Sequence, residues 1–330
     1  LPHCMDLLKE ADLLEAVEAQ GFIHKCGAVF RRGDEMCNFD FSQQFTDGWK
    51  YTFQVTRADF DKTLADTVAS RGVEIRYGHG VTAIEFNDDG ATVTIESPDK
   101  AVGRASARAE SSQENQLVSS LAPPDTATPS TYKISARFVL DCSGYGRVLP
   151  RLLDLEKPTN YPTREALFTH VTGDKRPPER EGGKIWACVH PGGAWVWIIP
   201  FSNGKTGVGV VATPEFFACY PGEPDEQLRT ILMSDPNVVA RLADMKFVFP
   251  ARRITGYACG IKQLYGPHYA LAGNATEFLD PIFSSGVTLA LASSNRAAKI
   301  ITRQLRGEDV DWQTDYTDHV MQGLNTFRTY

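Results

Sequence analysis

Trp195-Val196-Trp197-Ile198-Ile199-Pro200 is a short apolar stretch that carries two tryptophans and ends at a proline. Because side chains alternate along a strand, both indoles are predicted to lie on the same face of a β-sheet. Together they would form a wide aromatic wall with two N–H donors, and each donor needs a partner when it is buried. A well-packed core strand would show the same pattern, so the neighbouring sequence decides between the two interpretations.

Short apolar runs around this stretch predict an antiparallel sheet within residues 166–213. Its strands are separated by glycine turns and cover residues 185–189, 194–199 and 206–211. Beyond the sheet the pattern becomes helical over residues 225–245, with a break at Asp235-Pro236. The middle of the chain is therefore predicted to be a sheet followed by helices.

The rest of the chain predicts helices and strands in alternation. Helices are expected at residues 3–20, 57–70, 287–305 and within 309–330. Strands are expected at residues 28–30, 51–56, 73–77, 134–140 and 269–272. Two further strands, at residues 81–86 and 91–96, flank Asn87-Asp88-Asp89-Gly90 and predict a hairpin with Asp-Gly at its turn.

Bulk properties exclude several classes of protein. The net charge of −7 argues against a nucleic-acid partner, and no apolar run approaches the roughly 20 residues that span a bilayer. Seven scattered cysteines without a C-x-x-C motif fit reduced thiols in the cytoplasm and predict neither a zinc site nor a disulfide framework. Residues 98–131 are rich in Ser, Ala, Pro and Glu, which predicts a disordered surface insertion.

Three more motifs, together with the W-x-W-x-I-P pattern, resemble those of flavin-dependent halogenases. Lys25 lies in Phe22-Ile23-His24-Lys25-Cys26-Gly27-Ala28-Val29-Phe30, which is similar to the F-x-x-K-x-G-A-x-F pattern of the phenol-halogenating branch. Residues 273–286 resemble the second flavin-binding stretch of that family. Asp141-Cys142-Ser143-Gly144 resembles the D-x-x-G that flavoprotein hydroxylases place after a strand.

The resemblance covers essentially all 330 residues and implies a p-hydroxybenzoate-hydroxylase-like FAD-binding fold of the α/β (α+β) class. One domain over residues 1–330 is expected, with an antiparallel substrate-side sheet at about 160–260. The flavin-side segments would cover residues 51–97, 133–150 and 266–305. No G-x-G-x-x-G occurs in the chain, although this fold uses that motif to hold the flavin pyrophosphate. The expectation is therefore a chain that lacks its N-terminus.

The resemblance also implies roles for individual residues. Lys25 would deliver the halogen, as a haloamine or by a hydrogen bond to hypohalous acid. The backbone N–H groups of Ser285 and Gly286 would bind chloride or bromide at a helix start. An ordinary helix N-cap at Ser284 or Ser285 is the alternative, and both roles are compatible. Trp195 and Trp197 would line the tunnel between flavin and substrate.

The expected cofactor contacts depart from the family pattern at one position. The residues implied to contact FAD are Arg57, Val81, Asp141, Gly144, Gly273, Asn274, Pro281 and Gly286. Asn274 replaces the usual aspartate, which removes a charge but keeps one acceptor. Arg147 is expected to pair with a flavin phosphate or with Asp141. Phe283 stands where tryptophan halogenases carry a glutamate, which indicates a phenol or pyrrole substrate; simple packing of Phe283 against the substrate is the alternative.

The implied reaction is electrophilic chlorination or bromination of an electron-rich aromatic through a flavin hydroperoxide and hypohalous acid. Dioxygen and reduced FAD from a separate flavin reductase would be required, and the aromatic substrate would be free or tethered to a carrier protein. An aromatic hydroxylase on the same fold needs neither Lys25 nor the tryptophan pair, and an isoprenoid reductase would lack W-x-W-x-I-P. The missing glycine motif and Asn274 favour a third alternative, an inactive truncated flavoprotein.

Overall fold

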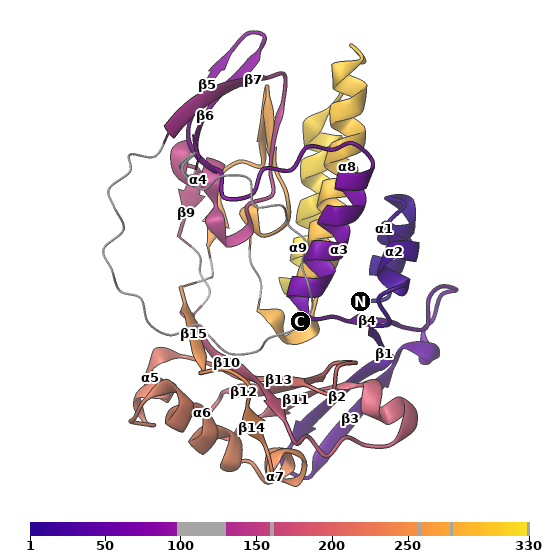
Figure 1. Cartoon of the computed structure of the whole chain (residues 1–330), viewed down its shortest axis with the longest axis vertical. Helices are drawn as coiled ribbons and strands as arrows, with labels where there is room; N and C mark the ends of the chain where they lie inside the picture. Colours follow the sequence, from indigo (N-terminus) through magenta and orange to yellow (C-terminus); the bar gives the residue numbers. More distant parts are fainter. Residues whose placement is uncertain (98–129, 159–161, 257–258, 278–279, 329–330) are drawn as a thin grey trace.

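Figure 1 shows a computed structural model of the chain that describes residues 1–97, 130–158, 162–256, 259–277 and 280–328. A large sheet with short helices forms one end of the molecule, and three long helices with smaller sheets form the other. The predicted insertion at residues 98–131 lies outside the described residues except for Ser130 and Thr131, which begin a strand.

The largest sheet that the structure describes has eight strands, with the Trp195–Pro200 strand near its centre. The spatial order is β14-β10-β13-β12-β11-β2-β3, and β15 pairs with β10. The bounds are β2 Gly27–Arg32, β3 Glu35–Asp40, β10 Glu165–Thr172, β11 Ile185–Val189, β12 Trp195–Pro200, β13 Thr206–Ala212, β14 Lys246–Phe247 and β15 Arg252–Thr255. The predicted antiparallel strands are confirmed, and β2 joins them parallel to β11.

The two faces of this sheet have different partners. One face carries Val196, Ile198 and Val208, which pack in a core under three helices. These helices are α5 Pro214–Ala218, α6 Pro224–Met233 and α7 Pro236–Leu242. The predicted break at Asp235-Pro236 is confirmed, because the Asp235 carboxylate caps α7 and accepts the N–H of Asn237. The opposite face turns Trp195 and Trp197 toward the rest of the molecule.

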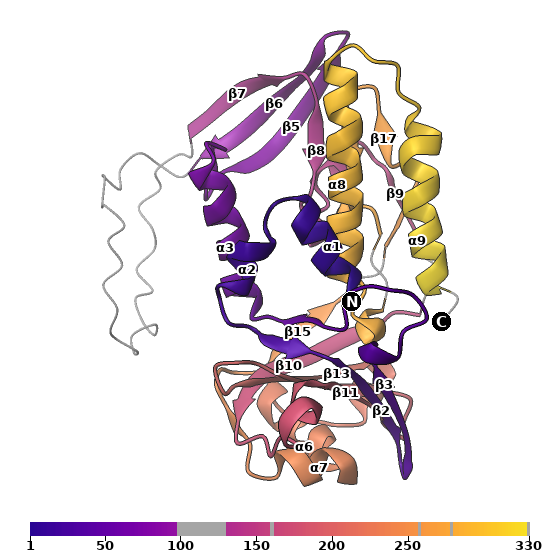
Figure 2. The same ribbon diagram turned by 90° about the vertical axis from the view of Figure 1, so that its right-hand side faces the viewer.

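The long helix α8 (Gly286–Leu305) connects two further cores at the other end of the molecule. Its first turns pack with α1 His3–Glu10, α2 Leu14–Glu18 and α3 Arg57–Ser70. Its second half packs with the π-helical turn Gln313–Thr317 and with α9 Asp318–Arg328. Figure 2 shows α8 beside α9, with α1 between α3 and α8. No helix in the described parts of the chain has both the length and the apolar character of a membrane span.

Smaller sheets complete this end of the molecule. The predicted hairpin is confirmed as β5 Gly80–Asn87 and β6 Gly90–Ser97, and β7 Ser130–Ala136 extends it. A second sheet joins β8 Val139–Asp141, β18 Tyr269–Leu271 and β17 Tyr265–Gly266. Two-stranded pairs are β1 Ile23–Lys25 with β4 Thr52–Gln54, and β9 Glu156–Lys157 with β16 Gly260–Ile261.

Three sequence-based expectations of secondary structure are wrong. Residues 3–20 form two helices instead of one, because Asp12 adopts a left-handed conformation with φ 57° between them. Residues 73–77 form no strand, since they pair with no described strand and leave Tyr77 71% exposed. The strand expected at 134–140 is divided into β7 and β8.

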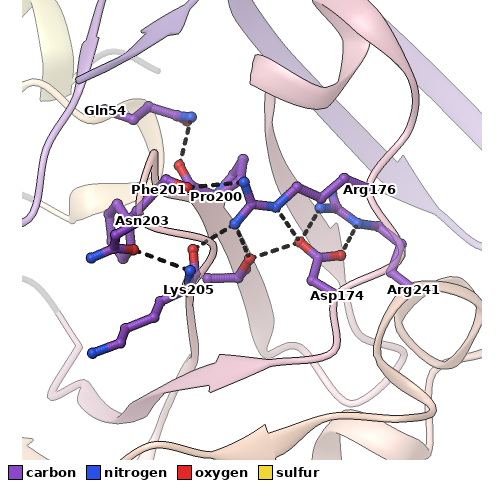
Figure 3. Close-up of polar contacts among 9 residues, drawn as sticks. Gln54, Asp174, Arg176, Pro200, Phe201, Asn203, Lys205 and Arg241 are labelled. Atoms are coloured by element: carbon purple, nitrogen blue, oxygen red, sulfur yellow. Dashed lines mark hydrogen bonds and ion pairs between the residues drawn. The ribbon is translucent and has the colours of Figure 1, made fainter. Parts of the chain in front are cut away.

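A buried ion cluster fixes the turn that follows the Trp195–Pro200 strand, as Figure 3 shows. Arg241 donates two hydrogen bonds to the Asp174 carboxylate, at 2.9 and 2.6 Å, and the side chains are only 4% and 1% exposed. Arg176 lies beside Asp174 and donates to two carbonyls of the turn between β12 and β13. Gln54 Nε2 donates to the carbonyl of Pro200 at 3.0 Å. The end of β12 is therefore held from two sides.

Candidate active site

Lys25 is a buried lysine at the end of β1, only 5% exposed. Within the described residues, no carboxylate or hydrogen-bond acceptor pairs with its amine. Burial lowers the pKa of Lys25 from 10.5 to about 8, and the Cys4 thiol opposes this shift. A substantial neutral fraction of the amine is therefore present at mildly alkaline pH, as nucleophilic or hydrogen-bonding chemistry requires.

Cys4 connects the surroundings of Lys25 to the start of α8. The Cys4 Sγ lies 3.0 Å from Thr288 Oγ1, and both side chains are buried. Thr288 is in the first turn of α8, two residues after Gly286. The lysine motif and the predicted halide loop are therefore neighbours, although more than 250 residues separate them in the sequence.

The loop before α8 presents backbone N–H groups in an arrangement that suits an anion. It forms a 3-10 turn, Pro281–Phe283, and then Ser284 adopts a left-handed conformation with φ 53°. Within the described residues, the N–H groups of Ser285 and Gly286 have no hydrogen-bond partner, as expected for the first turn of a helix. A side chain added at Gly286 would meet no atom within 4 Å. Open space, free donors and the helix dipole therefore coincide here.

The two tryptophans lie on one face of the sheet, as the alternation predicts. Their ring centroids are 5.8 Å apart at an interplanar angle of 50°. Both pack in one cluster with Ile282, so the halide loop touches the aromatic wall. The buried N–H of Trp195 has no hydrogen-bond partner among the described residues. Burial raises the pKa of the neighbouring Asp280, and the backbone N–H of Ile282, which donates to this carboxylate at 3.1 Å, opposes the shift.

Phe283 meets the end of the lysine motif. Its ring centroid lies 6.2 Å from that of Phe30, at an interplanar angle of 49°. Phe30 is the last residue of the F-x-x-K-x-G-A-x-F pattern, and β2 carries it to the face of the sheet that Trp197 occupies. The lysine motif, the tryptophan strand and the loop before α8 therefore meet in one place.

Arg57 and Val81 are both exposed and lie on different elements. Arg57 begins α3 and pairs with Asp61 at 3.0 Å, one turn later. Burial raises the pKa of Tyr145 to about 12, and the nearby Arg57 charge opposes the shift. Tyr145 follows Gly144, so the start of α3 lies close to the D-x-x-G turn. Val81 lies in β5 and is 39% exposed.

Asp141 organises the D-x-x-G turn from within. Its carboxylate accepts the backbone N–H groups of Ser143 and Leu149, both at 2.7 Å. The expected pairing of Arg147 with Asp141 is wrong. Arg147 instead donates to Glu156 at 2.7 Å, because the buried carboxylate of Asp141 is already occupied by backbone donors.

Replacing Asp141 with asparagine is expected to cost about 1–3 kcal/mol of stability, because one buried N–H loses its acceptor and faces an amide NH₂ instead. Urea unfolding of the variant and the parent protein would measure the loss. Asp89→Asn, in the exposed turn of the hairpin, is the control and should unfold like the parent. Equal stability of all three proteins would show that the carboxylate does not hold the turn.

The segment after β18 lies against the same turn. The N–H of Ala272 donates to the carbonyl of Asp141 at 2.9 Å. Gly273 has φ 57°, and a side chain there would press on Ala290 at 3.1 Å. Asn274 accepts a hydrogen bond from Arg147 through its carbonyl, while its side-chain amide bonds to no described residue. Asp141, Gly144, Gly273 and Asn274 are therefore brought together, as the sequence predicts.

Several contacts of the site were missed by sequence reasoning. Phe30 and Ile282 belong to recognised motifs, yet no motif showed that they contact the halide loop and the tryptophan wall. Phe168 lies beside Trp197, with ring centroids 6.2 Å apart. Only strand register places it there, and the sequence does not specify which strands pair.

Comparisons with known proteins identify the family. A family model described as tryptophan halogenase matches residues 19–329. Sulochrin halogenase of Aspergillus terreus is 27% identical over 97% of this chain and 59% of its own length. A 1H-pyrrole-2-carbonyl-[peptidyl-carrier protein] chlorinase of Pseudomonas fluorescens is 23% identical over 99% of this chain and 72% of its own.

A solved structure of higher identity carries a different description. It is a flavoprotein/dehydrogenase from Cytophaga hutchinsonii, 43% identical, with a TM-score of 0.87 over 99% of this chain and 74% of that one. The chain spans about three-fifths of the length of the sulochrin halogenase. The match of the family model over nearly the whole chain shows that the protein belongs to the tryptophan halogenase family of flavin-dependent enzymes.

Proposed function

We propose that the protein is an FAD-dependent halogenase that chlorinates or brominates an electron-rich aromatic ring, a phenol or a pyrrole. The observation that carries this proposal is the buried Lys25, whose amine pairs with no described residue, in a motif that contacts the anion-compatible loop, which in turn contacts the aromatic wall. An aromatic hydroxylase would not need this combination of a buried lysine, an anion-compatible loop and an aromatic wall. Membership of the halogenase family supports the same function.

The flavin would be held by residues from the segments 51–97, 133–150 and 266–305, which we assign to the flavin side. They would be Arg57, Val81, Asp141, Gly144, Gly273, Asn274, Pro281 and Gly286. Open space beside Gly144 and Gly286 and the unpartnered amide of Asn274 fit a bound cofactor. Bound reduced FAD, with dioxygen, would supply the oxidant that converts chloride or bromide into hypohalous acid.

The residues of the chain would then handle the halide and the electrophile. The N–H groups of Ser285 and Gly286 would hold the halide at the start of α8. Lys25 would accept the halogen from hypohalous acid as a haloamine, or orient the acid by a hydrogen bond. Trp195 and Trp197 would exclude water from the path between the two, which keeps the electrophile from being consumed by side reactions.

The substrate would lie beside Phe283 and the substrate-side sheet at about 160–260. A phenol or pyrrole needs less activation of the electrophile than an indole benzo-ring, so an apolar residue at position 283 is compatible with such a substrate. The pyrrole chlorinase among the relatives acts on a carrier-bound substrate by its name, and we propose a free or carrier-tethered aromatic here. A separate flavin reductase would supply reduced FAD, and seven unpaired thiols suit the cytoplasm.

The test is a halogenation assay on the full-length protein with FAD, a flavin reductase, NADH and bromide. Mass spectrometry would follow monochlorodimedone or a simple phenol. We expect a brominated product with the isotope doublet of bromine, and no such product from Lys25→Ala. Bound flavin and NADH oxidation with only oxygenated product would indicate a hydroxylase, and a protein that binds no flavin would indicate an inactive relic.

A further inference from the structure

A row of paired residues crosses five strands on the tryptophan face of the sheet. In register, Phe30 pairs with Ala187, and Ala187 pairs with Trp197. Trp197 pairs with Gly209, and Gly209 pairs with Phe168. Aromatic residues therefore alternate with the two smallest residue types along the row. Since cross-strand partners point to the same face, the three aromatic rings are separated only by the small residues.

The indole of Trp197 occupies the space that a side chain at position 209 would need. A Cβ atom built on Gly209 would lie 2.3 Å from Cζ2 and 2.5 Å from Cη2 of Trp197. It would also lie 2.6 Å from the Cβ of Phe168. Atoms that are not bonded do not approach so closely, so any other residue at position 209 would move the indole, the strand or both.

The two aromatic neighbours of Trp197 make only tilted ring contacts with the indole, and these contacts do not fix its plane as the space beside Gly209 does. Trp195 is tilted by 50° from Trp197, and Phe168 is tilted by 36°. Gly209 lies between Trp197 and Phe168 in the sheet, so the indole can lean across β13 toward the Phe168 ring. Trp197, Phe168 and Phe30 remain partly exposed on this face, where a flat aromatic molecule could contact them.

We propose that Gly209 is a positioning residue that sets the plane of the Trp197 indole, and that Phe168 is the second wall contact of that indole. The role of this indole as a wall of the substrate tunnel rests on the proposed halogenase function, which the inference deepens. Position 209 would decide how much room the wall leaves for a flat aromatic substrate. A methyl group there would turn the indole away from Phe168 and into the space in front of the wall.

The test uses the optical coupling of the two indoles and needs no cofactor or turnover. Two indoles 5.8 Å apart and tilted by 50° couple their transitions and produce a pair of opposite bands in far-ultraviolet circular dichroism. Trp195→Phe and Trp197→Phe should each abolish this pair of bands, which assigns it. Gly209→Ala should abolish or invert this pair of bands while the rest of the circular dichroism spectrum stays native. The control is Gly80→Ala, where the added Cβ meets no atom within 4 Å and the spectrum should not change.

A double-mutant cycle covers the case in which Gly209→Ala is too unstable for spectroscopy. Phenylalanine at position 197 lacks the outer indole carbons that collide with the new methyl group. The drop in urea midpoint caused by Gly209→Ala should therefore be clearly smaller in the Trp197→Phe background than in the parent protein. The inference is overturned by coupled bands that survive unchanged in Gly209→Ala, or by an equal drop in both backgrounds. Failure of the proposed function would instead appear as the absence of halogenated product from the parent protein.

Discussion

Replacing Lys25 with methionine is expected to make the protein more stable while it slows the proposed halogenation by about 10²- to 10⁴-fold. The ammonium group of Lys25 is buried and has no counter-charge among the described residues, so its protonated form is disfavoured in the folded protein. The difference between a pKa of 10.5 and one of about 8 corresponds to about 3 kcal/mol. Methionine has a similar length and no charge, and should therefore recover about this free energy at pH 7.

The gain in stability should depend on pH with a definite sign. The folded pKa of Lys25 lies below the unfolded value, so the unfolded chain binds the extra proton between about pH 8 and pH 10.5. The contribution of Lys25 to parent stability therefore rises over this window. The advantage of Lys25→Met should be complete below pH 8 and absent above about pH 10.5. Urea unfolding at pH 7 and pH 10 would measure it, and a variant less stable than the parent at pH 7 would contradict the buried, unpaired state.

The same substitution should remove the chemistry. Loss of a residue that carries or orients the reacting group costs about 10²- to 10⁴-fold in rate. Halogenation by the parent protein should rise as the pH passes through about 8, because the neutral amine then becomes abundant. Bound flavin should be unchanged in Lys25→Met. Equal halogenation rates in parent and variant would remove Lys25 from the mechanism.

Lys184 provides a matched control, since it is also a buried lysine but has partners. Its side chain is 2% exposed, and its ammonium contacts Glu181 at 2.5 Å and Asp40 at 3.2 Å. Lys184→Met breaks these ion pairs, so it should lower stability at pH 7, whereas Lys25→Met should raise it. The two variants therefore separate the effect of an unpaired buried charge from that of burial alone.

Replacing Asp174 with alanine is expected to cost about 3–5 kcal/mol, because it leaves the buried guanidinium of Arg241 without its counter-charge. Arg176 would lose the same partner, and the turn after Pro200 would lose one of its two anchors. Urea unfolding would measure the loss. The coupled circular dichroism bands of the two tryptophans would report whether β12 keeps its place.

Asp244 is the control for this experiment. It pairs with Lys175 at 2.9 Å in the same region, but both side chains are more than half exposed. Asp244→Ala should change stability by no more than about 0.5 kcal/mol. If Asp174→Ala were equally mild, the ion cluster in Figure 3 would not stabilise the end of the tryptophan strand.

Local sequence patterns determined much of the secondary structure. The strands around Trp195–Pro200 and the hairpin of β5 and β6 follow from alternation and from glycine at the turns. The helices α3 and α8 follow from helical spacing of apolar residues. Alternation also placed both indoles on one face, because that property depends on neighbours two residues apart and on nothing farther away.

Pairings between distant segments could not be read from the sequence. Strand β2 joins the large sheet parallel to β11, although about 150 residues separate them, and no local signal specifies that choice. The same holds for Arg147, which pairs with Glu156 because backbone donors already fill the Asp141 carboxylate. Residues 73–77 alternate apolar and charged side chains, which predicts a strand, but a strand forms only where a partner offers its backbone groups.

The sequence by itself determined which residues belong to the candidate site: the lysine motif, the tryptophan strand and the loop before α8. Only the tertiary structure decided their physical state. Among the described residues Lys25 has no partner, because the described segments that enclose it bring no carboxylate to its amine. Trp197 leans toward Phe168 because strand register places Gly209 between them. Both properties depend on which segments become neighbours, and chain folding sets that through contacts that no local pattern encodes.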